Sequence, residues 1–350
     1  MRRLLDADAD GDRHVDARAD GDAVAVPTPI RPDAFRVADP STAIAVRPLH
    51  EHDLAEADHI FRVAFGTFIG LPDPAQFAGD SDWIATRWRA DPSAAFAADV
   101  EGGLAGSVFA ANWGSVGFFG PLTVRPDLWD RGVARRLLEP VMDCFARWGT
   151  RHAGLYTFAQ SAKHVALYQR FGFYPRFLIA IMTKPCAAAS GAGYTRFSEV
   201  PVSECDAHLA ASRALTDALF AGLDVTREIR AVAAQQLGDT LFVWEQSRLA
   251  GIAVCHVGPG TEAGGGTCYV KFGASPAGDG TAFDRLLDAV EAYAADRGAA
   301  VLAGVNVGRE GAYRRLLARG YRTVIQGVAM HRPNTVGYDR PDAYVLDDWR

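Results

Sequence analysis

Apolar and polar positions in the first third of the chain predict a strand, two helices and an antiparallel sheet. An apolar stretch at residues 43–49 predicts a first strand, and apolar residues at helical spacing from Leu54 to Ala64 predict a helix that Asp53 can cap. A second helix is expected after Ser81. Alternating apolar residues then predict three strands joined by turns that contain glycine, at residues 95–100, 104–113 and 116–124.

Helices and strands continue to alternate up to residue 184. Helical spacing predicts a helix at residues 132–148, in which Pro140 should produce a bend. A strand at 153–158, a helix at 162–171 and a strand at 178–184 follow. The predicted order of this half is therefore β-α-α-β-β-β-α-β-α-β.

A stretch rich in Pro, Ala, Ser and Gly at residues 185–194 separates this half from a second one. The second half predicts strands at 240–245, 249–257, 267–274, 300–305 and 324–330, and helices at 282–297 and 310–319. We expect a mixed α/β (α+β) fold with two tandem domains, 41–184 and 195–332, each a mixed central sheet flanked by helices. Residues 1–40 are expected to form a disordered acidic tail, and residues 333–350 a C-terminal tail.

The stretch from Gly117 to Phe173 contains the features that indicate chemistry. An apolar strand ends at Val124, and the helix that follows it begins with the small residues Gly132-Val133-Ala134. A helix N-terminus presents unbonded backbone N–H groups and the positive end of the helix dipole. Because small residues let a phosphate approach the backbone, this helix start predicts an anion site.

The same residues resemble two motifs of the GNAT superfamily of acyl-CoA-dependent N-acyltransferases. Motif A is matched by Val124-Arg125-Pro126, Arg131-Gly132-Val133-Ala134 and Leu137-Leu138, and motif B by Leu167-Tyr168 with Gly172-Phe173. Trp129 replaces the opening Gln or Arg of motif A, and Asp130 stands where many members carry glycine. Residues 306–321 echo motif B, so the second half resembles a degenerate GNAT-like domain, as in mycothiol synthase-like members.

This resemblance implies acetyl-CoA as the cosubstrate and assigns residues to its parts. It implies that the backbone of Leu122, Thr123 and Val124 holds the pantetheine arm. It further implies that the pyrophosphate is bound by the N–H groups of Arg131, Gly132, Val133, Ala134 and Arg135. The side chains of Arg135 and Arg136 either approach the phosphates or belong to a solvated helix face, and the sequence leaves both interpretations open.

Three residues in and just before the predicted helix at 162–171 are candidates for contact with the cofactor. The resemblance implies that Tyr168 is the general acid that protonates the departing thiolate. Ser161, His164 and Tyr168 are spaced i, i+3 and i+7, so a helix places them on one face. Ser161 is expected to contact the CoA arm. His164 is a candidate proton relay, although a single histidine on a helix is also an ordinary packing residue.

The sequence does not identify a general base or an acceptor. The strand at 116–124 contains no Asp or Glu, so a water chain or an acid from elsewhere, such as Glu101 or Asp82, would remove the amine proton. Aromatic residues are dense around the expected cleft and favour an acceptor with an apolar part over a polycation. They are Phe65, Phe68, Trp83, Trp113, Phe118 and Phe119.

The second half has lost the residues that this chemistry requires. Aligning Leu286-Leu287 with Leu137-Leu138 places Thr281 at the position of Gly132 and Phe283 at that of Ala134. Leu316 falls at the position of Tyr168. We therefore expect one CoA site, in the first half, with the second half covering or shaping the acceptor cleft.

Composition limits the class of protein and its location. The 350 residues, 49% of them hydrophobic, suit two globular domains, and no apolar run reaches the ~18 residues of a membrane span. A net charge of -6 argues against nucleic acid as a partner, and five scattered cysteines suit free thiols in the cytoplasm. No metal site is expected, because Ala17 replaces the last ligand of the calcium-like run that starts at Asp6. An oligomer is compatible with the sequence.

Three functional hypotheses follow. The first is an N-acetyltransferase that moves an acetyl group from acetyl-CoA to a small-molecule or peptide amine by direct attack. The second is a CoA-binding sensor or regulatory module without turnover, which the missing base and Trp129 favour. The third is a scaffold that neither binds CoA nor catalyses. Fold-level analogy contributes to the first hypothesis.

Overall fold

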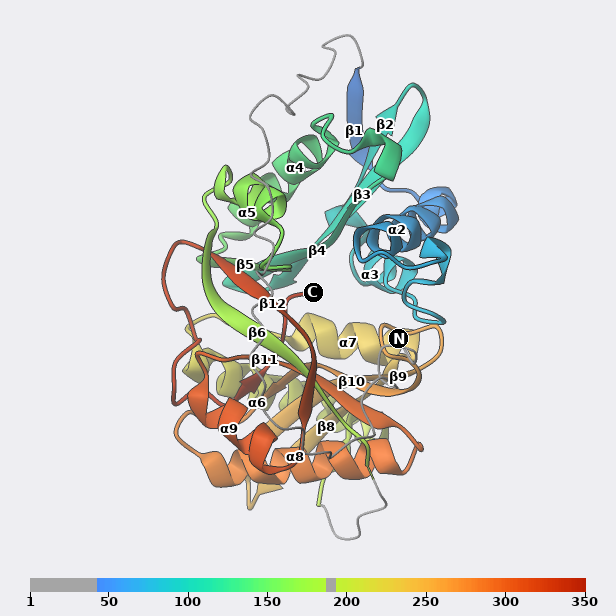
Figure 1. Cartoon of the computed structure of the whole chain (residues 1–350). Helices are drawn as coiled ribbons and strands as arrows, with labels where there is room; N and C mark the ends of the chain where they lie inside the picture. The colour runs from blue at the N-terminus through green and yellow to red at the C-terminus, as the bar shows by residue number, and fades with distance from the viewer. Residues whose placement is uncertain (1–42, 187–192) are drawn as a thin grey trace, which may run out of the picture.

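The computed structural model describes residues 43–186 and 193–350, so the predicted acidic tail and most of the predicted linker lie outside the described residues. The first half contains every element that the sequence predicts (Figure 1). These are β1 (Ile44–Pro48), α2 (Leu54–Phe68), α3 (Ile84–Ala90), β2 (Ala95–Val100), β3 (Gly103–Trp113), β4 (Val116–Val124), α4 (Val133–Trp148), β5 (His152–Thr157), α5 (Ala162–Gln169) and β6 (Tyr174–Lys184). Helix α4 runs through Pro140 and ends at Gly149, whose φ of 66° suits glycine.

The second half repeats this order, including two helices that the sequence analysis did not predict. Its elements are β7 (Thr195–Arg196), α6 (Val202–Leu219), α7 (Thr226–Gln235), β8 (Gly238–Glu245), β9 (Arg248–Gly258), β10 (Gly264–Ala274), α8 (Gly280–Ala295), β11 (Ala300–Asn306), α9 (Glu310–Ala318), β12 (Arg322–Arg332) and β13 (Val345–Leu346). Helix α6 escaped prediction because Ser212 and Thr216 are buried on its inner face, which weakens the contrast between apolar and polar positions.

All strands of the described chain belong to one mixed sheet, which confirms the predicted mixed α/β class. The strand order is β1-β2-β3-β4-β5-β12-β6-β11-β10-β9-β8-β7, with β13 attached to β10. Two neighbouring pairs are parallel, β4 with β5 and β10 with β11, and they occupy equivalent places in the two halves. The two predicted sheets are thus joined edge to edge.

The two halves exchange their last strands at the centre of this sheet. Strand β12 of the second half pairs with β5, and strand β6 of the first half pairs with β11. The two exchanged strands also pair with each other, antiparallel, between Tyr174 and Thr183 of β6. Whether residues 41–184 and 195–332 are separate domains in solution stays a prediction.

Helices cover both faces of the sheet and divide the interior into four clusters. Helix α4 packs with Tyr168 of α5 against one face of the first half, and α2 and α3 pack against the other. Helices α8 and α9 cover the second half on one face, and α6 and α7 on the other. The cluster under α6 and α7 also includes Trp113 and Phe118 of the first half, so it connects the halves.

Residues 333–350, predicted only as a tail, fold back across the middle of the sheet. Glycines on three strands make room for this segment. An added Cβ at Gly304 of β11 would lie 2.2 Å from the Asp348 Cβ, and one at Gly154 of β5 would lie 2.1 Å from the Trp349 ring. Close to β4, the Arg350 carbonyl carbon would lie 3.3 Å from a Cβ at Gly120. The segment therefore runs from β10 over β11 and β5 to β4.

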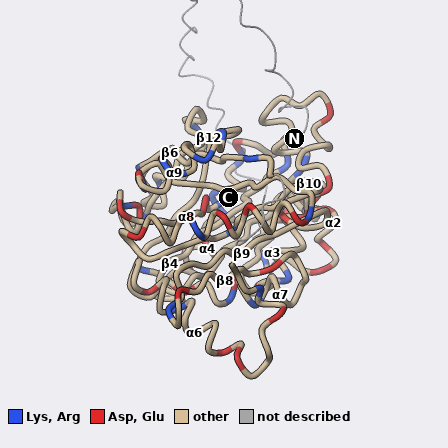
Figure 2. Tube along the Cα trace, turned by 90° about the horizontal axis from the view of Figure 1, so that it is seen from below, with Lys and Arg blue, Asp and Glu red and all other residues tan. Residues whose placement is uncertain are grey.

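Three further features concern the cysteines, the apolar character of the helices and the distribution of charge. The five cysteines are free, as predicted. Among the described helices, none has the length and apolar character needed to cross a membrane. Acidic and basic residues are intermixed along the chain in the view of Figure 2.

Candidate active site

Strands β4 and β5 pair only at their beginnings and then separate. Val116 to Phe118 lie beside His152 to Gly154, and no further pairs follow between the two strands. Beyond this point β4 stays bonded to β3 alone, with Leu122, Thr123 and Val124 opposite Val108, Ser107 and Gly106. The predicted pantetheine-binding residues therefore line one side of the gap between β4 and β5.

A bulge in β4 lies where the strands separate. Phe119 pairs with Ala110 and Leu122 pairs with Val108, so Gly120 and Pro121 occupy a register shift. Gly120 has a φ of 153°, within the range that favours glycine, and its peptide bond to Pro121 is cis. The bulge changes the course of β4 at the entrance of the gap.

The mouth of α4 is open, as its small residues suggest. Gly132 has a φ of 86° and open space where a Cβ would stand. The first bond of the helix joins Arg136 N–H to the Gly132 carbonyl, and the N–H groups of residues 132–135 find no partner in the described chain. Four donors are therefore free at the helix mouth.

Arg131 occupies a different environment from the one predicted. Its N–H donates to the Leu128 carbonyl at 3.4 Å, so it closes the preceding turn. Arg136 forms an ion pair with Glu139 on the helix surface. Arg135 is exposed and forms no ion pair within the described residues, so of these arginines it is the better placed to approach an anion.

The two departures from motif A have structural roles in the loop before α4. The Trp129 indole donates to the Val124 carbonyl at 2.8 Å, which fastens the loop to the end of β4. The Asp130 carboxylate contacts Lys163 of α5 at 2.7 Å. Lys163 also lies 5.6 Å from the centre of the Trp129 ring. Lys163 could not be predicted from the sequence, because no local pattern relates it to residue 130.

The candidate residues of α5 occupy its inner side but differ in surroundings. Tyr168 is 7% exposed and packs edge-on against Phe119, at 5.7 Å between ring centres. Burial raises the pKa of Tyr168, so the phenol keeps its proton at neutral pH. His164 lies 5.1 Å from the ring of Phe68, and burial with nearby Lys163 lowers its pKa. Ser161 is partly buried at the start of the helix.

Three of the six aromatic residues considered for the cleft, Trp113, Phe118 and Phe119, belong to the interior. Phe65 packs with Phe61 and Phe77, Trp113 and Phe118 pack against each other, and Phe119 packs against Tyr168. Phe65, Phe68 and Trp83 are only partly buried. Of the two acids considered as a base, Asp82 accepts the Ala85 N–H at the start of α3, and Glu101 is exposed at the β2–β3 turn. The base stays unassigned.

The helix mouth and the gap between strands, both open in the first half, are closed in the second half. The Asp279 carboxylate accepts the Ala282 N–H at the start of α8, and the Arg315 guanidinium lies 2.1 Å from a Cβ placed at Gly280. Phe283 is fully buried beside Tyr344, so it fills the space behind this helix start. Leu316 is also buried.

The gap in the second half is filled by the chain itself. Strands β10 and β11 pair from Thr267 to Val270, and β10 then pairs with β13 through Gly273 and Ala274. Strand β13 therefore occupies the place that corresponds to the gap between β4 and β5. This arrangement agrees with the expected loss of a CoA site in the second half.

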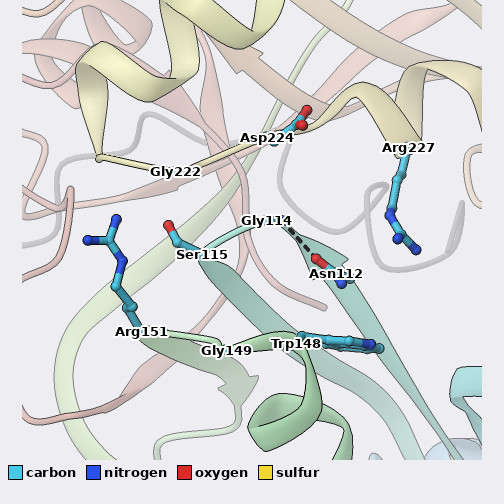
Figure 3. Close-up of a pocket in the computed structure, with 9 residues that line it drawn as sticks. All are labelled: Asn112, Gly114, Ser115, Trp148, Gly149, Arg151, Gly222, Asp224 and Arg227. Atoms are coloured by element: carbon cyan, nitrogen blue, oxygen red, sulfur yellow. Dashed lines mark hydrogen bonds between the residues drawn. The ribbon is translucent and has the colours of Figure 1, made fainter.

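A surface pocket lies away from these features. It has a volume of about 460 Å³ and is polar, with Arg151 and Arg227 among its side chains (Figure 3). Trp148 and Gly149 line it at the C-terminal end of α4, whereas the open mouth is at the other end. Because α4 has 16 residues, the two ends are about 24 Å apart. We assign the pocket no part in the site.

The resemblance to the GNAT superfamily implies an open helix mouth after a strand whose backbone is free to bind a ligand, and α4 and β4 have this arrangement. Residues 57–173 match the family described as acetyltransferase (GNAT) family. The chain therefore carries an acetyltransferase domain of the GNAT family at these residues. No curated protein matches the chain significantly.

Solved structures share the fold over both halves. A proposed acetyltransferase from Pyrococcus horikoshii is 13% identical, with 87% of this chain and 95% of that chain covered and a TM-score of 0.63. A GCN5-related N-acetyltransferase from Sphaerobacter thermophilus is 16% identical, with 83% of this chain and 95% of that chain covered and a TM-score of 0.54. A glucosamine N-acetyltransferase region of a fungal GH3 β-N-acetylglucosaminidase is 14% identical, with 83% of this chain and 38% of that chain covered and a TM-score of 0.56. At these identities the likeness shows the fold alone.

Proposed function

We propose that the first half binds acetyl-CoA and transfers its acetyl group to a primary amine by direct attack. The observation that carries this proposal is the contrast between the halves. The mouth of α4 is open beside separated strands, whereas Asp279, Arg315 and β13 close the equivalent features of the second half. One acetyl-CoA per chain is the expected stoichiometry.

In the proposed complex, the free N–H groups of Gly132, Val133, Ala134 and Arg135 bind the pyrophosphate. Leu122, Thr123 and Val124 lie along the gap that would receive the pantetheine arm. Such placement would hold the thioester at the bulge, near the point where β4 leaves β5. The acceptor would then approach from the side on which the second half packs.

The transfer needs two proton movements. The amine nitrogen attacks the thioester carbonyl carbon, a C–N bond forms, and the C–S bond breaks as the oxyanion collapses. Tyr168, which burial keeps protonated, would donate its proton to the departing thiolate. The proton lost by the amine passes to water, since Asp82 and Glu101 are placed elsewhere.

A calorimetric titration tests this proposal. Acetyl-CoA is titrated into the wild type and into Ala134→Phe, which copies the residue that the second half carries at the equivalent position. We expect one site in the wild type and no heat in the variant. A panel of small amines, including glucosamine, and peptides with free N-termini then identifies the acceptor by release of CoA. No heat in the wild type would refute the proposal.

A second function, CoA binding without turnover, is favoured by one observation. Two carboxylates near the bulge are engaged: Glu262 by Arg87 and Lys271, and Asp348 by Arg350 and the Tyr269 hydroxyl. Neither of these two carboxylates is therefore free to act as the general base. Tight binding of acetyl-CoA with no CoA release for any amine of the panel would select this function. Either function is proposed for the cytoplasm, with neither nucleic acid nor membrane as a partner.

A further inference from the structure

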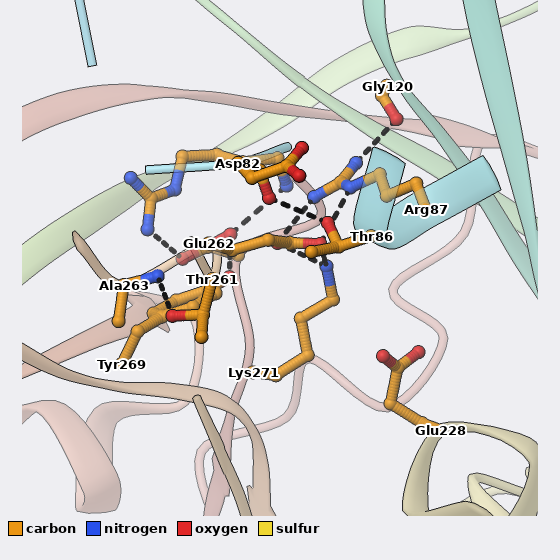
Figure 4. Close-up of polar contacts among 12 residues, drawn as sticks. Asp82, Thr86, Arg87, Gly120, Glu228, Thr261, Glu262, Ala263, Tyr269 and Lys271 are labelled. Atoms are coloured by element: carbon orange, nitrogen blue, oxygen red, sulfur yellow. Dashed lines mark hydrogen bonds and ion pairs between the residues drawn. The ribbon is translucent and has the colours of Figure 1, made fainter. Parts of the chain in front are cut away.

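Three charged side chains meet beneath β4, at the junction of the two halves (Figure 4). Arg87 extends from α3, Lys271 from β10 and Glu262 from the loop between β9 and β10. The Glu262 carboxylate contacts Arg87 at 2.9 Å through both of its oxygens, and Lys271 at 2.6 and 2.8 Å. The exposed fraction of the side chain is 9% for Arg87, 2% for Glu262 and 4% for Lys271. We call these residues the junction triad.

The junction triad also reaches the bulge of β4. The Nη1 of Arg87 donates to the Gly120 carbonyl, while Nε and Nη2 of the same guanidinium bind Glu262. Arg87 therefore connects the second half to the residue at which β4 changes course. This connection is polar and directional, because a charged guanidinium donates its hydrogen bonds.

The loop that presents Glu262 is itself fixed to the first half. The Asp82 N–H donates to the Thr261 carbonyl at 2.9 Å, and the Thr261 hydroxyl accepts the Ala263 N–H at 3.1 Å. The backbone hydrogen bond at Thr261 thus fixes the loop, and the Arg87 and Lys271 side chains bind the Glu262 carboxylate. Although burial acts to raise the pKa of Glu262, Arg87 and Lys271 lower it well below its usual range, so the carboxylate stays charged.

We propose that Arg87, held by Glu262 of the second half, is a positioning residue for acyl transfer that fixes the Gly120 bulge and thereby the acyl end of the bound thioester. The inference rests on the proposed function, because it concerns the gap beside β4. It also assigns the second half a role: its Glu262 orients a residue of the first half. A buried ion pair is a costly way to gain stability alone, since apolar side chains of similar volume often serve as well.

Two probes separate the acyl end of the site from the phosphate end. ADP carries the diphosphate that the mouth of α4 would bind, whereas acetyl-CoA also needs the gap that begins at Gly120. Loss of a hydrogen bond from a charged donor weakens an interaction by roughly tenfold or more. We expect Glu262→Gln to bind acetyl-CoA about tenfold more weakly and ADP with unchanged affinity.

The control variant is Asp339→Asn. Asp339 binds Arg309 at 2.6 Å, and both side chains are 1% exposed, so this variant also removes one carboxylate from a buried arginine. Arg309 and Asp339 belong to a network with Asp347 in the second half. We expect Asp339→Asn to lower the melting temperature as Glu262→Gln does, but to leave the affinities for both probes unchanged.

A further variant keeps the test decisive if Glu262→Gln does not fold. Arg87→Met, Glu262→Leu and Lys271→Met together replace the junction triad by apolar side chains, which should preserve folding while the Gly120 carbonyl loses its donor. We expect the same tenfold loss for acetyl-CoA alone. Unchanged acetyl-CoA affinity in this variant, or equal losses for both probes, would overturn the inference. A wild type that binds neither probe would instead refute the proposed function.

Discussion

Lys163 of α5 forms an ion pair with Asp130, at 2.7 Å between Nζ and Oδ1, beside the open mouth of α4. Asp130 stands where many members of the family carry glycine, and its charge would oppose a bound pyrophosphate. Lys163 offsets this charge from a different helix. The ion pair is exposed, with Lys163 at 52% and Asp130 at 72%, so its effect should be modest and sensitive to salt.

Replacing Asp130 by glycine should strengthen acetyl-CoA binding. The substitution removes a carboxylate near the phosphates, and glycine adopts the φ of 65° at this position without strain. We expect an affinity about threefold higher, measured by calorimetry at low salt. Asp127→Asn is the control, because Asp127 lies in the same loop but pairs with Arg125. An equal gain in both variants would show a general effect of charge.

Removing Lys163 should have the opposite effect, and only while Asp130 is present. Lys163→Ala leaves the carboxylate unpaired, so acetyl-CoA affinity should fall roughly threefold at low salt and recover at high salt. In the Asp130→Gly background the same substitution should change nothing. A loss of equal size in both backgrounds would mean that Lys163 contacts the phosphates directly.

Most helices and strands, though not α6 and α7, could be predicted from the sequence because their periodicity is local. The exchange of β6 and β12 could not be predicted from the sequence. Both strands have nearly the same pattern, four or more buried residues after five more exposed ones, so either strand suits the edge of either half. The pairing is decided by contacts between residues far apart in the chain.

The site was predictable to a similar degree. Small residues at 132–134 indicated an open helix mouth, because backbone donors there depend on the nearest residues only. Arg87 and Glu262 were missed, because they meet across 175 positions and Glu262 lies in a glycine-rich loop without periodicity. The role of residues 345–350 was missed for the same reason, since it depends on glycines in several strands.

Gly154→Ala should destabilise the protein by displacing the C-terminal segment. An added methyl would lie 2.1 Å from the Trp349 ring, a distance that forces the segment to move. Overpacking of this kind costs about 1–3 kcal/mol, which denaturant unfolding would measure. Gly193→Ala is the control, because no atom of the described residues lies within 4 Å of its added Cβ. Equal stability of the two variants would contradict the packing described for Trp349.

His256 should make stability fall in mild acid. It is 1% exposed, and burial lowers its pKa from 6.5 to about 4, although nearby Glu262 acts in the opposite direction. The unfolded chain therefore takes up this proton between pH 6.5 and 4 while the folded chain does not, so stability declines as the pH falls through this range.

The variant His256→Leu tests this dependence. Between pH 7 and 4.5, urea unfolding of the wild type should show a loss of roughly 2–3 kcal/mol attributable to this residue, and the variant should lack that part. His152, whose pKa burial also lowers to about 4, contributes separately and stays in both proteins. Identical pH slopes for the wild type and His256→Leu would show that His256 is accessible to protons.

The exchanged strands have a consequence for synthesis. Strand β5 obtains its neighbour β12 only when residues 322–332 have left the ribosome, although the rest of the first half is complete by residue 184. Until then β5 and β6 both lack the partner strands that they have in the complete fold. The native pairing of the first half therefore depends on translation of the second, and a message truncated between the halves would yield a polypeptide in which β5 and β6 must find other partners.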